Sequence, residues 1–254
     1  MNQFNSTIQK QRNYKSQINM KALGQYFTPE FLTEQMTSMI SKSKNSAILE
    51  PSAGKGIFLT TLQSKGFQNI CGVEIDNTLT NESNVDIIYE NFLTWKPPKK
   101  YDVVIGNPPY IRWKNLPQNI RNELKEMKLC NGLMDILHAF ILKAIDVLTD
   151  DGEMILITPD YWLRTLHTKK LREIMMEKGH IEKIIMYGEK PIFKNVASSI
   201  MIFKFVKNHS KSKFTVVDMT EKIQYKQKQF TDSSIWSMFP FSISKQIDRD
   251  QKQQ

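Results

Sequence analysis

The stretch that decides the fold is Tyr101-Asp102-Val103-Val104-Ile105-Gly106-Asn107-Pro108-Pro109-Tyr110. Its first six residues form a short apolar run, which predicts a buried β-strand. The two prolines fix φ and lack N–H donors, so the strand must end in a stiff turn. This turn offers an amide, a backbone carbonyl and an aromatic ring, a set that suits a planar exocyclic amine. A plain proline turn at a strand end is the alternative.

Strand-like and helix-like segments alternate on both sides of this strand. We expect strands at 47–49, 70–74, 85–89, 103–105 and 154–158, helices at 30–41, 55–65, 134–149 and 167–178, and a short helix after residue 74. Residues 181–187 and 198–206 look like a closing antiparallel pair. The alternation predicts an α/β fold with a doubly wound, mostly parallel sheet, whose ligands bind beyond the carboxyl ends of the strands.

Composition limits the class of protein. Charged residues make up 24% and hydrophobic residues 40% of the 254 residues, as in globular proteins. The net charge of +9 favours a polyanionic partner, although a lysine-rich genome would explain it equally well. Cys71 and Cys130 have no metal-like spacing, and no apolar run approaches the roughly 18 residues that cross a bilayer. We therefore expect a cytoplasmic protein without a structural metal and without a membrane partner.

The chain divides into three parts by pattern. Residues 1–22 form a polar N-terminal extension, 23–207 carry the alternating pattern of a single domain, and 208–254 form a C-terminal extension where the pattern weakens. We expect one large domain with two appendages.

A loop rich in small residues joins the first strand to the next helix. It reads Leu49-Glu50-Pro51-Ser52-Ala53-Gly54-Lys55-Gly56. Glycines let the backbone approach a ligand closely, and the helix N-terminus adds N–H donors. The loop is not a phosphate loop, because no Gly-Lys-Ser/Thr follows, and it lacks the dinucleotide Gly-x-Gly-x-x-Gly pattern.

Two further candidates follow the second and third strands. Glu74 lies roughly 20 residues after the loop, where an acidic residue commonly accepts two ribose hydroxyls. A surface carboxylate at a strand end is the alternative. Asn91 and Phe92 follow the third strand, where an amide can bond an adenine edge and a phenyl ring can stack on it. Core packing is the alternative for Phe92.

These motifs, with Gly24-Gln25-Tyr26-Phe27-Thr28-Pro29 upstream and Phe193 downstream, resemble a known family over residues 20–206. The chain is similar to DNA adenine-N6 methyltransferases of the gamma-ordered group, the Eco57I-like methylases of type IIG and related restriction–modification systems. The resemblance implies a Rossmann-like class I methyltransferase fold with a seven-stranded, mostly parallel sheet and a closing antiparallel hairpin. It also implies S-adenosyl-L-methionine as cofactor and double-stranded DNA as partner.

The resemblance assigns a role to each motif. Asn91 stands where the family usually has Asp, and this departure keeps an acceptor oxygen. The implied catalytic residues are Asn107, Pro108, Pro109, Tyr110 and Phe193. The implied cofactor-binding residues are Phe27, Thr28, Glu50, Pro51, Ser52, Ala53, Gly54, Gly56, Glu74, Ile75, Asn91, Phe92 and Asn107.

The implied chemistry is methyl transfer to the N6 amine of a flipped adenine. Asn107 Oδ1 and the Pro108 carbonyl would accept the two amine hydrogens and stabilise developing positive charge. Tyr110 and Phe193 would hold the extruded base between two rings. Arg112 and Lys114 are candidate phosphate contacts or solvated loop charges.

Other activities stay open. A release-factor glutamine methyltransferase shares Asn-Pro-Pro-Tyr, because a glutamine amide has the same planar NH2 group. Three features of the sequence argue against this activity. They are the 24–29 motif, Phe193 and the 50–54 loop, which reads Glu-Pro-Ser-Ala-Gly. RNA-adenine methyltransferases usually replace one of the two prolines. A non-catalytic subunit that only holds DNA or a partner is a rival from another class, and the intact 107–110 motif argues against it.

The family usually carries a target-recognition domain after the catalytic one. Here only residues 207–254 follow the last strong strand, which we interpret as the start of a truncated recognition region. The chain is then expected to be a fragment, a truncated product or one half of a split enzyme with a separate specificity chain. No convincing nuclease constellation is present in the sequence, so we expect methylation without cleavage.

Overall fold

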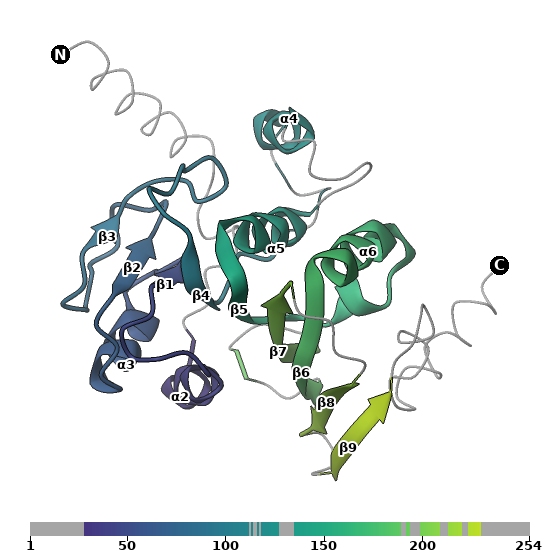
Figure 1. Ribbon diagram of the computed structural model, residues 1–254. Helices are drawn as coiled ribbons and strands as arrows, with labels where there is room; N and C mark the ends of the chain where they lie inside the picture. The colour runs from purple at the N-terminus through teal and green to yellow at the C-terminus, as the bar shows by residue number, and fades with distance from the viewer. Residues whose placement is uncertain are drawn as a thin grey trace.

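The computed structural model describes residues 28–111, 113, 116, 118–126, 135–188, 192–193, 199–208, 213–219 and 223–229. One twisted sheet runs through this part of the chain, with α2 and α3 on one face and α5 and α6 on the other (Figure 1). This is the doubly wound arrangement that the alternating pattern predicts.

The parallel half of the sheet contains five strands. They are β1 (Ile48–Glu50), β2 (Ile70–Val73), β3 (Ile87–Ile88), β4 (Tyr101–Gly106) and β5 (Leu148–Pro159). Their spatial order is β3-β2-β1-β4-β5, and every neighbouring pair is parallel. The order reverses direction at β1 and β4, so the carboxyl ends of these two strands form the topological switch point where ligands bind in such sheets.

The second half of the sheet corrects the expected strand number. β6 (Gly179–Gly188) and β7 (Ile200–Lys207) form the expected antiparallel pair, and β7 lies against β5. β8 (Lys213–Asp218) then pairs parallel to β6, and β9 (Ile223–Gln229) pairs antiparallel to β8. The described sheet therefore has nine strands instead of seven, because part of the C-terminal extension continues it. The domain boundary near residue 207 stays a prediction.

The helices agree with the pattern in most places. They are α2 (Glu30–Ser38), α3 (Ile57–Ser64), α4 (Gln118–Glu126), α5 (Ile136–Val147) and α6 (Lys169–Lys178), with the 3-10 turns η3 (Tyr161–Leu163) and η4 (Leu166–Thr168). Helix α4 was not expected from the sequence. The short helix expected after β2 was wrong, since residues 74–86 are all described and form turns.

Two hydrophobic clusters fill the space between the sheet and its helices. One cluster joins α5 and α6 to the sheet and includes Phe140 and Trp162. The other joins α2 and α3 to the opposite face and includes Met36 and Phe58. Burial of these apolar surfaces is the main stabilising term.

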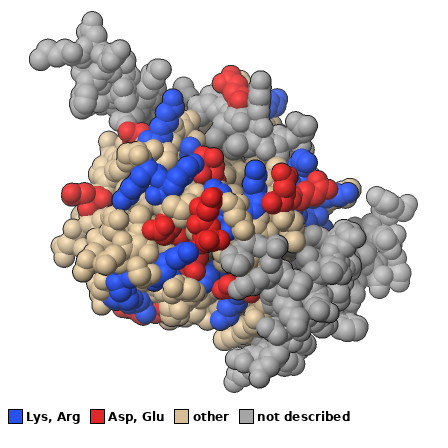
Figure 2. All heavy atoms as spheres, viewed as in Figure 1, with Lys and Arg blue, Asp and Glu red and all other residues tan. Residues whose placement is uncertain are grey.

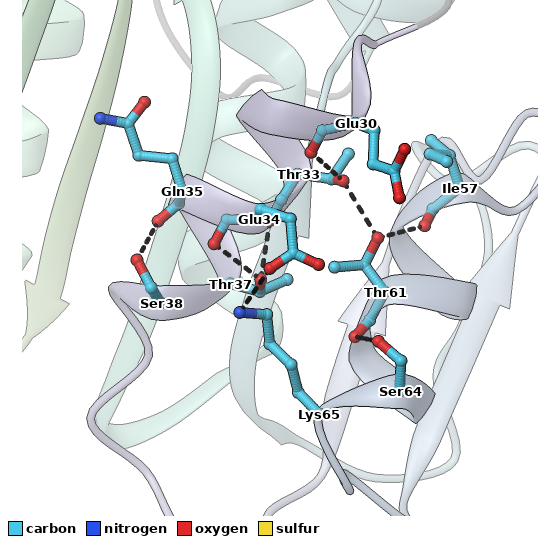
Figure 3. A network of polar contacts seen from close by, with 10 residues as sticks. All are labelled: Glu30, Thr33, Glu34, Gln35, Thr37, Ser38, Ile57, Thr61, Ser64 and Lys65. Atoms are coloured by element: carbon cyan, nitrogen blue, oxygen red, sulfur yellow. Dashed lines mark hydrogen bonds and ion pairs between the residues drawn. The ribbon is translucent and has the colours of Figure 1, made fainter.

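Polar contacts tie α2 to α3, the helix that follows the 50–56 loop (Figure 3). Thr33 Oγ1 and Thr61 Oγ1 share a buried hydrogen bond of 3.0 Å, and Lys65 Nζ lies 2.7 Å from Glu34 Oε2. Helix α2 therefore sits in a fixed place beside the loop.

A buried lysine fixes the chain just after α2. Lys204 on β7 is 2% exposed, and its Nζ lies 3.2 Å from Glu153 Oε1 and 3.0 Å from Glu182 Oε1. The same ammonium donates to Met39 O at 3.0 Å and Ser41 Oγ at 2.7 Å. Because the charge is paired and hydrogen-bonded, its burial is tolerated and residues 39–41 are anchored to the sheet.

The surface carries charges of both signs. On the face that Figure 2 shows, Lys and Arg side chains are interspersed with Asp and Glu side chains rather than gathered in one basic field. The net charge of +9 therefore does not by itself locate a polyanion site on this face.

Candidate functional site

The candidate site lies at the carboxyl ends of β1, β2 and β4. Parallel pairing aligns Glu50 with Gly72 and Leu49 with Val104, so Glu50, Glu74 and Asn107 leave the sheet at the same edge. Side chains that are distant in sequence are thereby brought to one place by the strand register.

Glu50 is a buried carboxyl group at the end of β1. It is 1% exposed, and its Oε2 has no hydrogen-bond partner among the described residues. Burial raises the pKa of Glu50 well above its usual value, and the nearby Glu74 carboxylate raises it further. An orphaned acceptor of this kind suits a cationic hydrogen-bond donor, such as the ammonium group of an amino acid.

Glu74 bridges the two neighbouring loops. Its Oε2 accepts from the Gly54 N–H at 2.8 Å and its Oε1 accepts from the Asp76 N–H at 2.8 Å. Burial is the main reason that the pKa of Glu74 is raised, although these backbone donors oppose the shift. Each carboxylate oxygen keeps a second lone pair, so the group can still accept two hydroxyls of a ribose.

Two glycines shape the loop between Glu50 and α3. Gly54 has φ +56°, and a Cβ added there would meet nothing within 4 Å. Gly56 has φ +90° and is the N-cap of α3, where an added Cβ would lie 2.9 Å from Ser83 Cβ. The close approach of Ser83 shows why this position is occupied by glycine.

The remaining loop residues differ in their exposure. Pro51 and Ala53 are buried, whereas Ser52 is half-buried. Ile75, directly after Glu74, is 36% exposed and presents an apolar side chain at the edge of the sheet. Residues 24–27 of the 24–29 motif, Phe27 among them, lie outside the described residues, as do Arg112 and Lys114.

Asn91 and Phe92 occupy a turn after β3. Asn91 Oδ1 accepts from the Leu93 N–H at 3.1 Å, so the amide shapes its own turn. Phe92 is 2% exposed, and its ring lies 5.1 Å from that of Phe140 on α5. Phe92 therefore contributes to the core, and its stacking on a cofactor stays a prediction.

Asn107 connects the proline turn to the rest of the site. Its Nδ2 donates to Thr28 Oγ1 at 3.1 Å, and its backbone carbonyl accepts from Ser52 Oγ at 2.9 Å. Its Oδ1 accepts from the hydroxyl of Tyr110, which also contacts Ile157 O at 2.6 Å. The amide is thus held on both sides, with Thr28 fixing which end carries the NH2 group. Sequence reasoning did not foresee these anchors, since nothing in the 50–56 loop or the 24–29 motif alone indicates which side chains face residue 107.

The two rings assigned to a bound base lie in different surroundings. Tyr110 is half-buried and packs against the cluster that contains α5 and α6. Phe193 is 4% exposed and belongs to the cluster that contains α2 and α3. Pro108, which is buried, and Pro109, which is half-buried, directly precede Tyr110 in the chain. The role of Phe193 at a base therefore stays a prediction.

Neither a metal cluster nor a membrane span is found in the part of the chain that the structure describes. No group of three or more His, Cys, Asp or Glu side chains there could hold a metal ion. No described helix is long and apolar enough to cross a bilayer.

The fold is that of a class of proteins, the class I S-adenosylmethionine-dependent methyltransferases. A Listeria monocytogenes protein assigned to that class matches with a TM-score of 0.63 and 22% identity, over 76% of this chain and 66% of that one. The methyltransferase subunit of a Streptococcus thermophilus type I restriction–modification system matches with a TM-score of 0.60 and 18% identity, over 90% of this chain and 53% of that one.

Within this class the chain belongs to the Eco57I restriction-modification methylase family, whose model matches residues 32–193. The resemblance noted from the sequence is thereby confirmed. The type II methyltransferase M.HincII of Haemophilus influenzae is 35% identical over 244 residues, which cover 90% of this chain and 48% of that protein. The type II restriction enzyme and methyltransferase RM.Eco57I of Escherichia coli is 27% identical over 54% of this chain. The chain spans about half the length of the first of these relatives.

Proposed function

We propose that the protein transfers a methyl group from S-adenosyl-L-methionine to the N6 amine of a flipped adenine in DNA, as the modification methylase of a restriction–modification system. The observation that carries the proposal is the 2.9 Å hydrogen bond from Ser52 Oγ to Asn107 O. This bond holds the amine-binding turn against the loop of the cofactor side.

The residues around the loop fit S-adenosyl-L-methionine. Glu50 supplies for the ammonium group a buried oxygen that has no partner among the described residues, and Glu74 keeps lone pairs for the two ribose hydroxyls. Ile75 offers an apolar contact for the adenine ring. When bound, the cofactor supplies an electrophilic methyl group on a sulfonium ion.

Asn107 is the group that would act on the substrate amine. A carbonyl oxygen has two lone pairs, so Oδ1 can accept an amine hydrogen besides the Tyr110 hydroxyl. The Pro108 carbonyl would accept the second hydrogen and favour a pyramidal nitrogen. Because both acceptors are held in place beforehand, they stabilise developing positive charge without reorganising. The amine needs no general base before attack, and its proton leaves to water afterwards.

The proposal includes partners that the described residues do not test. We expect double-stranded DNA as the substrate. Adenine N6 is hidden in a duplex, so the base must be flipped out, and the rings of Tyr110 and Phe193 would then hold it. A separate specificity or target-recognition chain is the expected source of sequence selectivity. The cytoplasm, where such DNA is found, stays the proposed location.

A methylation assay tests the function directly. The protein is incubated with mixed genomic DNA and S-adenosyl-L-methionine, and the DNA is digested to nucleosides and analysed by mass spectrometry. We expect N6-methyladenine with the wild type and none with Asn107→Ala, while calorimetry shows similar cofactor binding for both. Equal turnover in Asn107→Ala would refute the proposed mechanism. Product on a release factor but not on DNA would favour glutamine methylation instead.

A further inference from the structure

Asp135 is a buried acidic residue that the catalytic and cofactor motifs leave out. It precedes α5 as the N-cap residue and is 9% exposed. An N-cap aspartate commonly accepts from the first N–H groups of its own helix and stabilises that helix by about 1 kcal/mol. The Asp135 side chain makes no such capping bond. Its carboxylate is therefore directed to something other than α5.

Both oxygens of Asp135 bind neighbouring segments. Oδ1 accepts from the backbone N–H of Trp113 at 2.5 Å, and Oδ2 accepts from the hydroxyl of Tyr161 at 3.0 Å. Beside them, the Ile136 N–H donates to Ile111 O at 3.4 Å. Hydrogen bonds to an ionised acceptor are roughly twice as strong as neutral ones. Asp135 thus joins the chain after the proline turn to the turn that follows β5.

These two segments flank the amine site. Trp113 comes three residues after Tyr110, and Tyr161 begins η3 immediately beyond β5. The Tyr110 hydroxyl contacts Ile157 O on the same strand β5. The segment that carries Tyr110 is therefore connected to β5 through the Tyr110 hydroxyl and to η3 through Asp135.

We propose that Asp135 is a positioning residue for the amine site: it clamps Trp113 to Tyr161 of η3 and so holds the nearby Tyr110 ring in place for the methyl acceptor. The effect on the reaction rests on the proposed function, whereas the clamp itself does not. The partners of this carboxylate, Trp113 and Tyr161, are not among the residues proposed to bind the cofactor.

The experiment compares Asp135→Asn with Tyr161→Phe and with the control Asp146→Asn. Asp146 lies at the other end of α5, far from the turn in sequence. Its side chain is exposed, and its Oδ1 lies 3.9 Å from Lys100 Nζ. Asp135→Asn keeps the shape but removes the charge, so only a neutral amide oxygen remains to accept from the Trp113 N–H. Tyr161→Phe removes only the hydroxyl donor. Thermal melting establishes that each full-length variant is folded.

Two measurements are made on each variant. Hydrogen exchange of the Trp113 amide reports the clamp. We expect it to accelerate roughly fivefold to tenfold in Asp135→Asn, less in Tyr161→Phe and not at all in Asp146→Asn, because a neutral acceptor protects this N–H less than a charged one. Steady-state methylation reports whether the clamp contributes to catalysis. We expect kcat to fall roughly tenfold to a hundredfold in Asp135→Asn, with an unchanged KM for the cofactor.

Each result decides one of two points. Unchanged exchange at Trp113 in folded Asp135→Asn would overturn the clamp, whatever the activity. Faster exchange with unchanged kcat would overturn the positioning role. Absence of methyl transfer in the wild type would refute the proposed function, whereas the exchange result would still decide the clamp.

Discussion

Replacement of Glu50 by glutamine should make the protein more stable without cofactor and unable to bind it well. Glu50 is 1% exposed, and its Oε2 lacks a partner in the described part of the chain. A neutral side chain of the same shape removes a buried charge and its repulsion from Glu74. Natural sites of this kind trade stability for function.

The magnitude follows from the burial. An unsatisfied polar group that is buried costs about 1–3 kcal/mol, and an ionised group costs more. Some of this cost is offset in Glu50 by proton uptake, since its pKa is raised well above its usual value of 4.5. We therefore expect Glu50→Gln to increase the free energy of unfolding by about 1–3 kcal/mol at neutral pH.

The raised pKa of Glu50 determines how the free energy of unfolding changes with pH. A carboxyl whose folded pKa lies above its unfolded pKa holds its proton more tightly when folded, so stability falls as pH rises from 4.5 through the folded pKa. Below 4.5 both states are protonated and this penalty disappears. The difference between Glu50→Gln and the wild type should therefore be largest at neutral pH and shrink as the pH falls toward 4.5. The raised pKa of Glu74 acts in the same direction and is present in both proteins.

Urea denaturation across this pH range measures the difference, and calorimetry measures cofactor affinity. We expect S-adenosyl-L-methionine to raise the melting temperature of the wild type and to have little effect on Glu50→Gln. The control Glu90→Gln changes an exposed carboxylate and should alter neither quantity. A variant that is less stable than the wild type by the same amount at every pH would refute the reasoning.

Three further outcomes are expected. Tyr110→Ala should lower turnover more than Tyr110→Phe, because a stacking role needs the ring. Equal losses of turnover in the two variants would argue against stacking. Tyr110→Phe also measures how much the hydroxyl contact with Asn107 contributes to turnover. Lys204→Met should lower the free energy of unfolding by about 3–5 kcal/mol in urea titrations, because Glu153 stays buried without its cation; a loss below about 1 kcal/mol would mean that the carboxylate finds other partners. Thr28→Val should remove the acceptor of the Asn107 amide and lower kcat while Thr28→Ser restores it; equal activity of the two variants would show that the 3.1 Å bond does not orient Asn107.

The sequence predicted the parallel core because its signals are local. Strands β1, β2 and β4 are short apolar runs, and each is followed by small or polar residues that end it. The pairing of β6 with β7 was predicted for the same reason. The longest helices, α5 and α6, show the apolar spacing that their burial requires.

The errors have physical causes. After β2, Asp76 Oδ1 accepts from the Thr78 N–H at 2.9 Å and Asn81 Oδ1 accepts from the Ser83 N–H at 2.9 Å, and such side-chain bonds replace those of the expected helix. Helix α4 buries only a narrow apolar stripe and is otherwise polar. Strand β8 depends on an open edge of β6, which is a property of the folded sheet rather than of its own residues.

The sequence predicted that the candidate residues lie at strand ends, but it did not predict which side chains they contact. Glu50, Glu74 and Asn107 could be placed at strand ends from sequence, and the register brings them to one edge. The core position of Phe92 and the bonds of Asn107 depend on residues far away in sequence. Asp135 carried no motif signal because its partners are a backbone N–H and a hydroxyl.

The two glycines of the 50–56 loop should differ in how freely they change during evolution. Both have positive φ, but of these two positions only Gly56 is one where an added Cβ would meet another residue, Ser83. Asparagine and aspartate adopt the left-handed region at small cost, so position 54 can drift to either of them as related sequences diverge. Position 56 can change only if residues 81–83 move away at the same time. Because position 56 has no side chain, the loop packs closely against the turn at residues 81–83. We therefore expect these two segments to change together during evolution.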